Sequence, residues 1–326
     1  MTRSIVLDLA VTASSAPVQA QAQASDGVPR LSVAAALTTA RLAATAGVDA
    51  LRLVDLPGDD AVLDPSVAAA YLAGSGSGPG LLVEAPTSHN APYNLARRLL
   101  SLDRATGGRA GLVLRPGQGD AVSDLTAPDP AARDPRERWA EYAGILTRLW
   151  DSFPARALRG DQEAGIFADE SIITPIDHRG RYYRVAGPLD GPASRQARPV
   201  LAAADVDTLG WNVVAVVADV VLVDPDQAAT ANRLLSEALA AAGRRRDEVR
   251  LLGRALVPAG DEPAVIERLR HWMDSSGFNG LSLTVPGGPA EIATVLREVV
   301  PALKGPDRNR ATLRTAIGLP ALAGSH

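Results

Sequence analysis

Short apolar runs, rich in leucine and β-branched residues, alternate along the chain with longer alanine-rich stretches whose apolar positions recur at helical spacing. Eight runs have the length of a β-strand: 5–10, 50–54, 80–84, 110–114, 199–203, 218–223, 249–257 and 280–285. Eight stretches are predicted as helices: 32–46, 65–73, 91–102, 135–151, 208–217, 227–242, 263–275 and 289–303. Continuous apolar strands that alternate with amphipathic helices indicate a parallel sheet with helices packed outside it. Eight such units in 326 residues predict an α/β fold, a single (β/α)8 TIM barrel spanning residues 1–326.

The same alternation is compatible with a doubly wound open sheet, which a count of strand–helix units alone does not exclude. In that fold a GxGxxG turn commonly follows the first strand. No such turn follows residues 5–10. The missing turn weakens the open-sheet alternative, which the residues alone leave open.

Three segments interrupt the alternation. Residues 12–30 are rich in Ala, Gln and Ser, residues 116–134 are rich in Gly, Pro and Asp, and residues 153–198 include the sequence HRGRYY. We interpret 153–198 as a hairpin-containing insertion between the fourth helix and the fifth strand, and 304–326 as a C-terminal tail. Segments that follow barrel strands lie at the face where ligands bind, but loops of this composition are equally typical of tolerated insertions.

The composition narrows the possible chemistry. The chain has no cysteine, which excludes thiol catalysis, disulfides and cysteine-ligated metals. Lys304 is the only lysine and lies in no P-loop, and the four scattered histidines predict no metal site. A net charge of −4 without a basic run gives no indication of nucleic-acid binding. The apolar runs reach only strand length and the first contains Asp8, so we expect no membrane span and no signal peptide, and we predict a cytoplasmic protein.

One set of motifs carries a family resemblance. Residues 92–98 read PYNLARR, followed by SLDR at 101–104 and GGRAG at 107–111, and the blocks RWAEY at 138–142, HRGRYYRV at 178–185 and VVPAL at 299–303 come later in the same order. The chain thus resembles the luciferase-like, flavin-dependent monooxygenases of the nitrilotriacetate and dibenzothiophene-sulfone type. The resemblance implies a (β/α)8 barrel that oxidises a small organic substrate with O2 and reduced FMN, the FMN being supplied by a separate flavin reductase. It also implies a homodimer, or a heterodimer with a related barrel.

The resemblance also implies where the flavin would lie. The positions that match the family's flavin site are Asp55, Thr87, Ser88, Arg138 and Trp139. Arg115, at the end of the fourth predicted strand, is a further candidate for cofactor binding, because it would bring positive charge into the mouth of the barrel. His89 is our first candidate for a catalytic acid or base, because it lies on a loop after a barrel strand. The alternative is that it is a polar residue at a helix start. His178, in the HRGRYY hairpin, is the second candidate, with a structural role as its alternative.

Several positions depart from the family pattern. After the fifth strand the family has a Gln-Ala-Gly-Ser-Ser type sequence that binds the FMN phosphate, whereas this chain has Ala203-Ala204-Asp205-Val206-Asp207. Two carboxylates would repel a phosphate dianion, although either could be an ordinary helix N-cap. The family's Arg-Tyr pair is Arg138-Trp139, and its flavin-facing Asn and Thr after GGRAG are Val113 and Pro116.

These departures leave two functions open. In the first, the chain is a luciferase-like monooxygenase that uses reduced FMN and O2 and has impaired flavin binding. In the second, it is a non-catalytic, flavin-free paralogue without a cofactor that acts as a partner subunit or as a small-ligand-binding barrel. In that case large side chains such as Trp139 and Trp211 would fill the volume that FMN occupies in relatives.

Overall fold

In the computed structural model, residues 3–13, 27–56, 62–76, 78–117, 127–304 and 311–324 are described. Residues 14–26 of the predicted 12–30 segment, 118–126 of the 116–134 segment, and 305–310 and 325–326 of the 304–326 tail lie outside these residues. Within the described residues, eight parallel strands form a closed barrel: β1 (Ser4–Thr12), β3 (Ala50–Leu53), β4 (Gly80–Pro86), β5 (Ala110–Arg115), β10 (Val200–Ala203), β11 (Val220–Val223), β12 (Arg250–Leu256) and β13 (Gly280–Thr284). Each strand pairs with the next in chain order, and β13 pairs with β1 from Ser4↔Gly280 to Asp8↔Thr284. The closed barrel confirms the predicted fold and excludes the open sheet.

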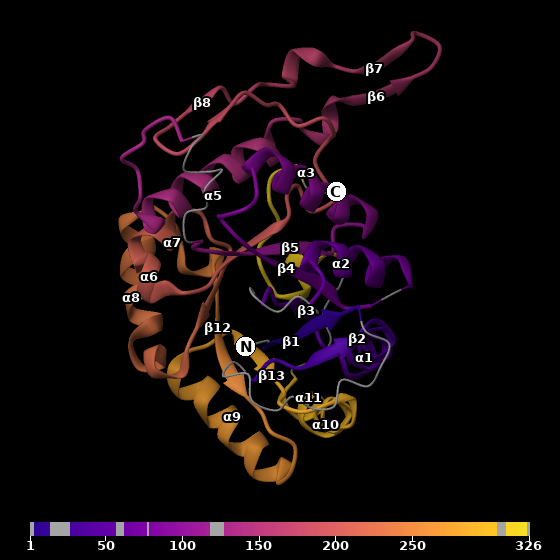
Figure 1. Ribbon diagram of the computed structural model, residues 1–326, viewed down its shortest axis with the longest axis vertical. Helices are drawn as coiled ribbons and strands as arrows, with labels where there is room; N and C mark the ends of the chain where they lie inside the picture. The colour runs from indigo at the N-terminus through magenta and orange to yellow at the C-terminus, as the bar shows by residue number, and fades with distance from the viewer. Residues whose placement is uncertain are drawn as a thin grey trace.

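Helices cover the outside of the barrel (Figure 1). They are α1 (Val33–Ala46), α2 (Pro65–Gly74), α3 (Pro92–Ala105), α5 (Pro135–Asp151), α6 (Val206–Leu209), α7 (Trp211–Val217), α8 (Ala228–Ala241), α9 (Glu262–Ser276), α10 (Pro289–Thr294), the π-helical turn Val295–Val299 and α11 (Val300–Leu303). Local sequence explains where some begin: Asp64 and Asp134 accept hydrogen bonds from the first-turn amides of α2 and α5, and each is followed by proline. The predicted helix 208–217 is instead two, because Gly210, at φ 82°, separates α6 from α7.

The 153–198 segment contains two antiparallel hairpins. The first, β6 (Leu158–Asp161) with β7 (Ile166–Ala168), projects away from the barrel, as Figure 1 shows, and exposes Phe167. The second, β8 (His178–Arg179) with β9 (Arg184–Val185), lies over α5 (Figure 1). A short strand, β2 (Arg30–Ser32), pairs in parallel with the end of β1.

The N-terminal end of the barrel is closed. Apolar side chains from alternate strand positions fill the lumen, and Leu313 of α12 (Leu313–Ala316), with Ile317 and Leu319, packs beneath them. Beside this plug the buried guanidinium of Arg314 donates to Asp219 at 2.9 and 3.2 Å. A ligand would therefore approach from the opposite end, at the C-terminal ends of the strands, which we call the mouth.

Candidate active site

Charged side chains cross the barrel lumen below the mouth. Arg52 of β3, 2% exposed, donates from Nε and Nη2 to Glu84 Oε2 at 2.9 and 2.5 Å, and from Nη1 to Asp8 Oδ2 at 3.1 Å. Asp8 also accepts from the hydroxyls of Ser282 and Thr284 at 2.6 and 2.9 Å. Burial lowers the pKa of Arg52, but the carboxylates of Glu84 and Asp8 outweigh that effect, so the pKa is raised. Arg52 is therefore a permanent cation between two buried carboxylates.

The chain of charges continues to the mouth. Arg115, at the end of β5, donates to Glu84 Oε1 at 3.2 Å and to Asp205 Oδ2 at 2.8 Å. The Arg115 side chain is 38% exposed and that of Asp205 is 24% exposed, so this end reaches solvent. We call Asp8, Arg52, Glu84, Arg115 and Asp205 the ion network; three carboxylates face two guanidiniums in it.

Sequence reasoning identified only part of the ion network. It placed Arg115 at the mouth because this residue ends a predicted strand, and the family resemblance placed Asp205 there, in the phosphate-binding segment. It assigned no role to Asp8, Arg52 or Glu84. A signal was available, since each is a charged residue inside an apolar run of strand length, and a charge in a buried strand requires a partner.

Asp55 and His89 also lie at the mouth. Asp55 follows β3 and is half-buried; burial raises its pKa, as do the charges of Glu84 and Asp64, while Arg115 and His89 act in the opposite direction. Its carboxylate makes no hydrogen bond or ion pair with the described residues. His89 is exposed and has φ 60°, a left-handed conformation that is uncommon for residues other than glycine. The structure thus brings Asp55, His89 and Arg115 within electrostatic reach of one another.

Thr87 and Ser88 are buried in the loop after β4. The Thr87 hydroxyl accepts from the Gly117 amide at 2.9 Å, and the Thr87 carbonyl accepts from the Tyr183 hydroxyl at 3.3 Å. Gly117 packs so closely that a Cβ there would lie 2.4 Å from Ser88 Oγ. In this arrangement the two residues fix the loop against its neighbours.

Arg138 and Trp139 lie behind the mouth, on α5. Arg138 is 2% exposed, and its guanidinium carbon lies 5.3 Å from the centre of the Tyr182 ring. Trp139 is fully buried, and its indole N–H donates to the Leu114 carbonyl of β5 at 2.9 Å. This bond joins α5 to the barrel wall and uses the single donor of the indole.

The structure brings His178 to α5 rather than to the ion network. Its Nε2 lies 2.9 Å from Glu141 Oε1. The same carboxylate accepts from the amides of Arg181, Tyr182 and Tyr183 at 3.0, 3.1 and 2.8 Å. Glu141 therefore fastens the turn of the second hairpin to the outer helix, and His178 is part of that attachment.

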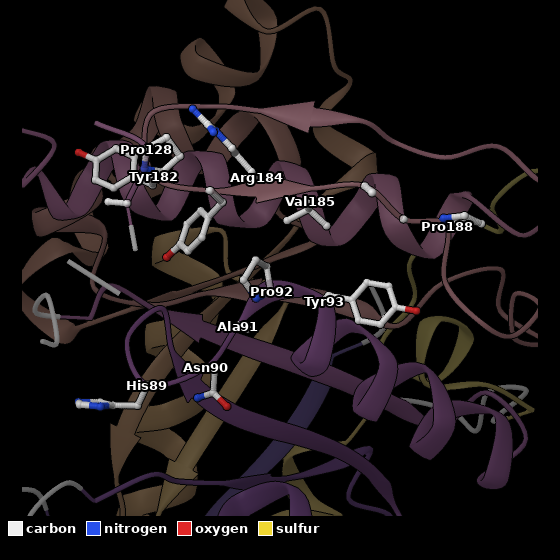
Figure 2. A pocket seen from close by; sticks show the side chains of 14 residues that line it. His89, Asn90, Ala91, Pro92, Tyr93, Pro128, Tyr182, Arg184, Val185 and Pro188 are labelled. Carbon is white, nitrogen blue, oxygen red and sulfur yellow. The ribbon is translucent and has the colours of Figure 1, made fainter. Parts of the chain in front are cut away.

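A cleft of about 1070 Å³ lies between the β4–α3 loop and β9. Figure 2 shows Pro92 on one wall and Val185 on the other, with Tyr93 nearby and His89 at a distance from β9. Tyr182, Tyr183 and Pro128 also line it, and no acidic side chain is among its described lining residues. Trp139 and Trp211 are not among them either. In the part of the chain that the structure describes, no group of three or more His, Asp or Glu side chains is arranged to hold a metal ion, and no helix is long and apolar enough to cross a membrane.

Comparison with known proteins agrees with this architecture. The model of the luciferase-like monooxygenase family matches residues 11–303. Dibenzothiophene-sulfone monooxygenase from Rhodococcus erythropolis is 29% identical over 264 residues, which are 76% of this chain and 58% of that protein, so the chain spans little more than half of this relative. One of the subunits of pristinamycin IIA synthase from Streptomyces pristinaespiralis is 28% identical over 290 residues, 88% of this chain and 89% of that one.

A solved structure shows the same fold. EDTA monooxygenase from Chelativorans sp. BNC1 superposes with a TM-score of 0.78 at 19% identity, over 98% of this chain and 99% of the other. Together with the match of the family model over most of the barrel, this confirms the resemblance found in the sequence motifs. The chain belongs to the luciferase-like monooxygenase family.

Proposed function

We propose that the chain is a component of a monooxygenase that oxidises a small organic substrate with O2 and reduced FMN from a separate flavin reductase, and that its own barrel binds FMN weakly. Family membership supports the reaction class, and the name of the dibenzothiophene-sulfone relative supports a small organic substrate. The observation that carries the weak binding is the ion network across the mouth.

The positions that match the family's phosphate contacts do not fit the phosphate of FMN. A phosphate site needs unoccupied N–H donors or free cations. Arg115 is paired with both Glu84 and Asp205, and Arg138 is buried against Tyr182. Asp205 precedes α6, a helix of only four residues, and places a carboxylate where an anion would approach. The family's phosphate contact after the fifth strand therefore has no counterpart here, and we derive no reaction step through FMN.

The second candidate is a partner subunit without flavin, in a heterodimer with a related barrel. The match to pristinamycin IIA synthase favours it, because that relative is named as one subunit of a synthase and is covered over 89% of its length. A second barrel would then supply the flavin site. A homodimer of this chain would instead contain two copies of the same mouth, each crossed by the ion network.

Calorimetric titration of the full chain with oxidised FMN, and anaerobically with reduced FMN, tests the proposal. We expect binding only at Kd values of about 100 μM or weaker, which is at most about 5.5 kcal/mol of binding free energy. Micromolar binding would contradict the weak site and leave an ordinary flavin monooxygenase. No binding of either form would exclude FMN use by this chain alone and favour the partner subunit, which co-purification with a second barrel would then test.

A further inference from the structure

The outer face of α2 has no charged residue. Val67 and Tyr71, one turn apart on this helix, are 59% and 57% exposed. Ala70 and Gly74 are exposed at the same helical spacing, so the four residues form one uncharged stripe. The outer faces of α8 and α9 instead expose charges of both signs, which is typical of a helix that faces water. A helix that is apolar on all sides is typical of one that is covered on all sides.

Basic side chains flank this apolar stripe. α2 packs between α1 and α3, and the exposed charged residues of those two helices are all arginines: Arg41 of α1, and Arg97, Arg98 and Arg104 of α3. Arg97 is paired with Asp190, whereas no carboxylate of the described residues pairs with Arg41 or Arg104. We call the outer surface of α1, α2 and α3 the basic face. A protein segment that fits it has both apolar side chains and carboxylates.

The arm, which we define as residues 158–170, has both. It consists of the first hairpin and the turn that follows, and it contains four acidic residues and one arginine. Leu158, Ile166 and Phe167 of the arm are 42%, 48% and 69% exposed, so its own barrel leaves these apolar side chains largely in water. A two-stranded hairpin on its own is only marginally stable. The arm is therefore opposite in charge to the basic face and, like it, has uncovered apolar side chains.

Figure 1 shows the arm leaving the barrel beyond α3, toward the side of the molecule where α2 lies. α5, the helix that precedes the arm, packs against α3. Each molecule thus contributes one arm and one basic face, and a pair related by a two-fold axis satisfies both contacts at once. From this complementarity we infer that the chain forms a homodimer in which the arm of each protomer docks on the basic face of its partner. This interaction surface goes beyond the proposed function and does not depend on flavin binding.

Reversal of charge tests which surfaces meet. Glu163→Lys with Glu170→Lys makes the arm basic, and Arg41→Glu with Arg104→Glu places acids on the basic face; all four residues are exposed. Each doubly substituted protein alone should dimerise at least about tenfold more weakly than the unaltered chain, because like charges then meet at both contacts. An equimolar mixture of the two should recover the original affinity, since each arm then meets a face of opposite charge. Sedimentation equilibrium of the full chains measures these dissociation constants.

Phe167→Ser tests the apolar part of the contact. Truncation of an aromatic side chain at the centre of an interface should weaken the dimer at least about tenfold, while the thermal midpoint of the isolated protomer stays unchanged because Phe167 is exposed. The matched control reverses two exposed carboxylates outside the arm, Glu267→Lys with Asp226→Lys. It should leave the dissociation constant within about twofold of the unaltered value.

The arm can also be removed as a unit. At its base the Asp169 amide donates to the Ala157 carbonyl at 2.7 Å, so the chain leaves the barrel and returns to it at one point. Replacement of residues 158–168 by Asn-Gly, a pair that closes tight hairpins, should therefore give a folded monomer. Circular dichroism checks its fold independently of its association state.

Three results would overturn the inference. An unaltered chain that stays monomeric would exclude a second copy as the occupant of the basic face and leave that face to another protein. A mixture of the two charge-reversed proteins that dimerises no better than either alone would show that the arm and the basic face do not meet. An armless variant that dimerises as tightly as the unaltered chain would place the contact elsewhere on the molecule.

Discussion

At the scale of single residues, the buried charges of the ion network define this barrel. Moving an ion out of water costs several kcal/mol, which close pairing offsets only when every charge has its partner. Arg52 meets that condition through Glu84 and Asp8, and Asp8 is completed by two hydroxyls of β13. The ion network therefore determines which side chains can occupy the barrel lumen more than it adds to the free energy of unfolding.

Replacement of Arg52 tests whether the buried carboxylates need their cationic partner. Arg52→Met keeps much of the side-chain volume and leaves Glu84 and Asp8 buried without their cation, so we expect the free energy of unfolding to fall by about 3–5 kcal/mol. Arg233→Gln, which breaks an exposed pair with Glu237, should cost less than about 1 kcal/mol. Urea denaturation compares the two, and similar losses would contradict a buried network.

Asp103 gives a pH-dependent prediction. Burial raises its pKa to about 6, although Ser194, the Ala110 amide and Gln196 all donate to it. The folded state thus favours the protonated acid, whose stabilising contribution is complete below pH 4 and is lost as pH rises through 6. The unaltered protein should lose up to about 3 kcal/mol of unfolding free energy over that interval, relative to Asp103→Asn.

Urea denaturation at several pH values between 4 and 7.5 measures this difference. Asp226→Asn, at an exposed position, is the control and should keep the pH dependence of the unaltered protein. If Asp103→Asn shows the same pH dependence of the unfolding free energy as the unaltered protein, the raised pKa of Asp103 is not the cause of that dependence.

The sequence could locate a candidate residue only where the place of that residue follows directly from its position along a strand. Asp55 and Arg115 lie at the mouth because each ends or directly follows a strand. The orientation of Trp139 depends on how α5 packs on β5, and the position of His178 depends on Glu141, 37 residues earlier in the chain. Such contacts between elements leave no local pattern, so their partners could not be read from sequence.

At the scale of elements, one side chain attaches the second hairpin. The carboxylate of Glu141 accepts hydrogen bonds from three consecutive backbone amides and also contacts Nε2 of His178. Strands as short as β8 and β9, of two residues each, are not stable alone. The wall that β9 gives to the cleft therefore depends on this attachment.

Glu141→Gln should release the hairpin. The amide retains one acceptor oxygen but turns its own NH2 toward backbone N–H donors, so we expect a loss of about 1–3 kcal/mol and faster hydrogen exchange at Arg181–Tyr183. Glu137→Gln, whose half-exposed side chain pairs with Arg181, is the matched control on the same helix. Unchanged exchange in Glu141→Gln would mean that other contacts hold the hairpin.

The elements themselves were largely predictable. All eight predicted strands correspond to barrel strands, because continuous apolar runs between helical stretches have few other structures available. The division of 208–217 at Gly210 was missed, since an isolated glycine within a helical pattern is often tolerated. The pairing of β2 with β1 was missed because it joins residues across a segment that the pattern treats as a loop.

At the scale of the whole molecule, closure of the barrel depends on the pairing of β13 with β1. Gly280 starts β13, where a Cβ would lie 2.0 Å from the Ser4 carbonyl oxygen. Backbone lies on the other side of this contact, so the space cannot be made by turning a side chain. The first and last strands of the barrel, β1 and β13, therefore meet at a position where only glycine fits.

Gly280→Ala should therefore separate β13 from β1 and lower the thermal midpoint strongly, or leave the protein unfolded. Gly144→Ala, on α5 with open space at its Cβ, should instead raise stability by up to about 1 kcal/mol, because alanine favours helix. Calorimetry distinguishes the two. Equal midpoints for both variants would mean that the β13–β1 contact yields easily.

The graded burial of the ion network also limits how this mouth can change by mutation. Asp8, Arg52 and Glu84 are fully buried, so replacement of any one of them leaves the others buried without a charged partner. The effects of substitutions at these three positions are therefore strongly non-additive. Arg115 and Asp205 reach solvent, where a lost partner is replaced by water. Single mutations can therefore retune the outer pair, whereas the inner three can be exchanged only together, and new ligand preferences in this lineage are most accessible through Arg115 and Asp205.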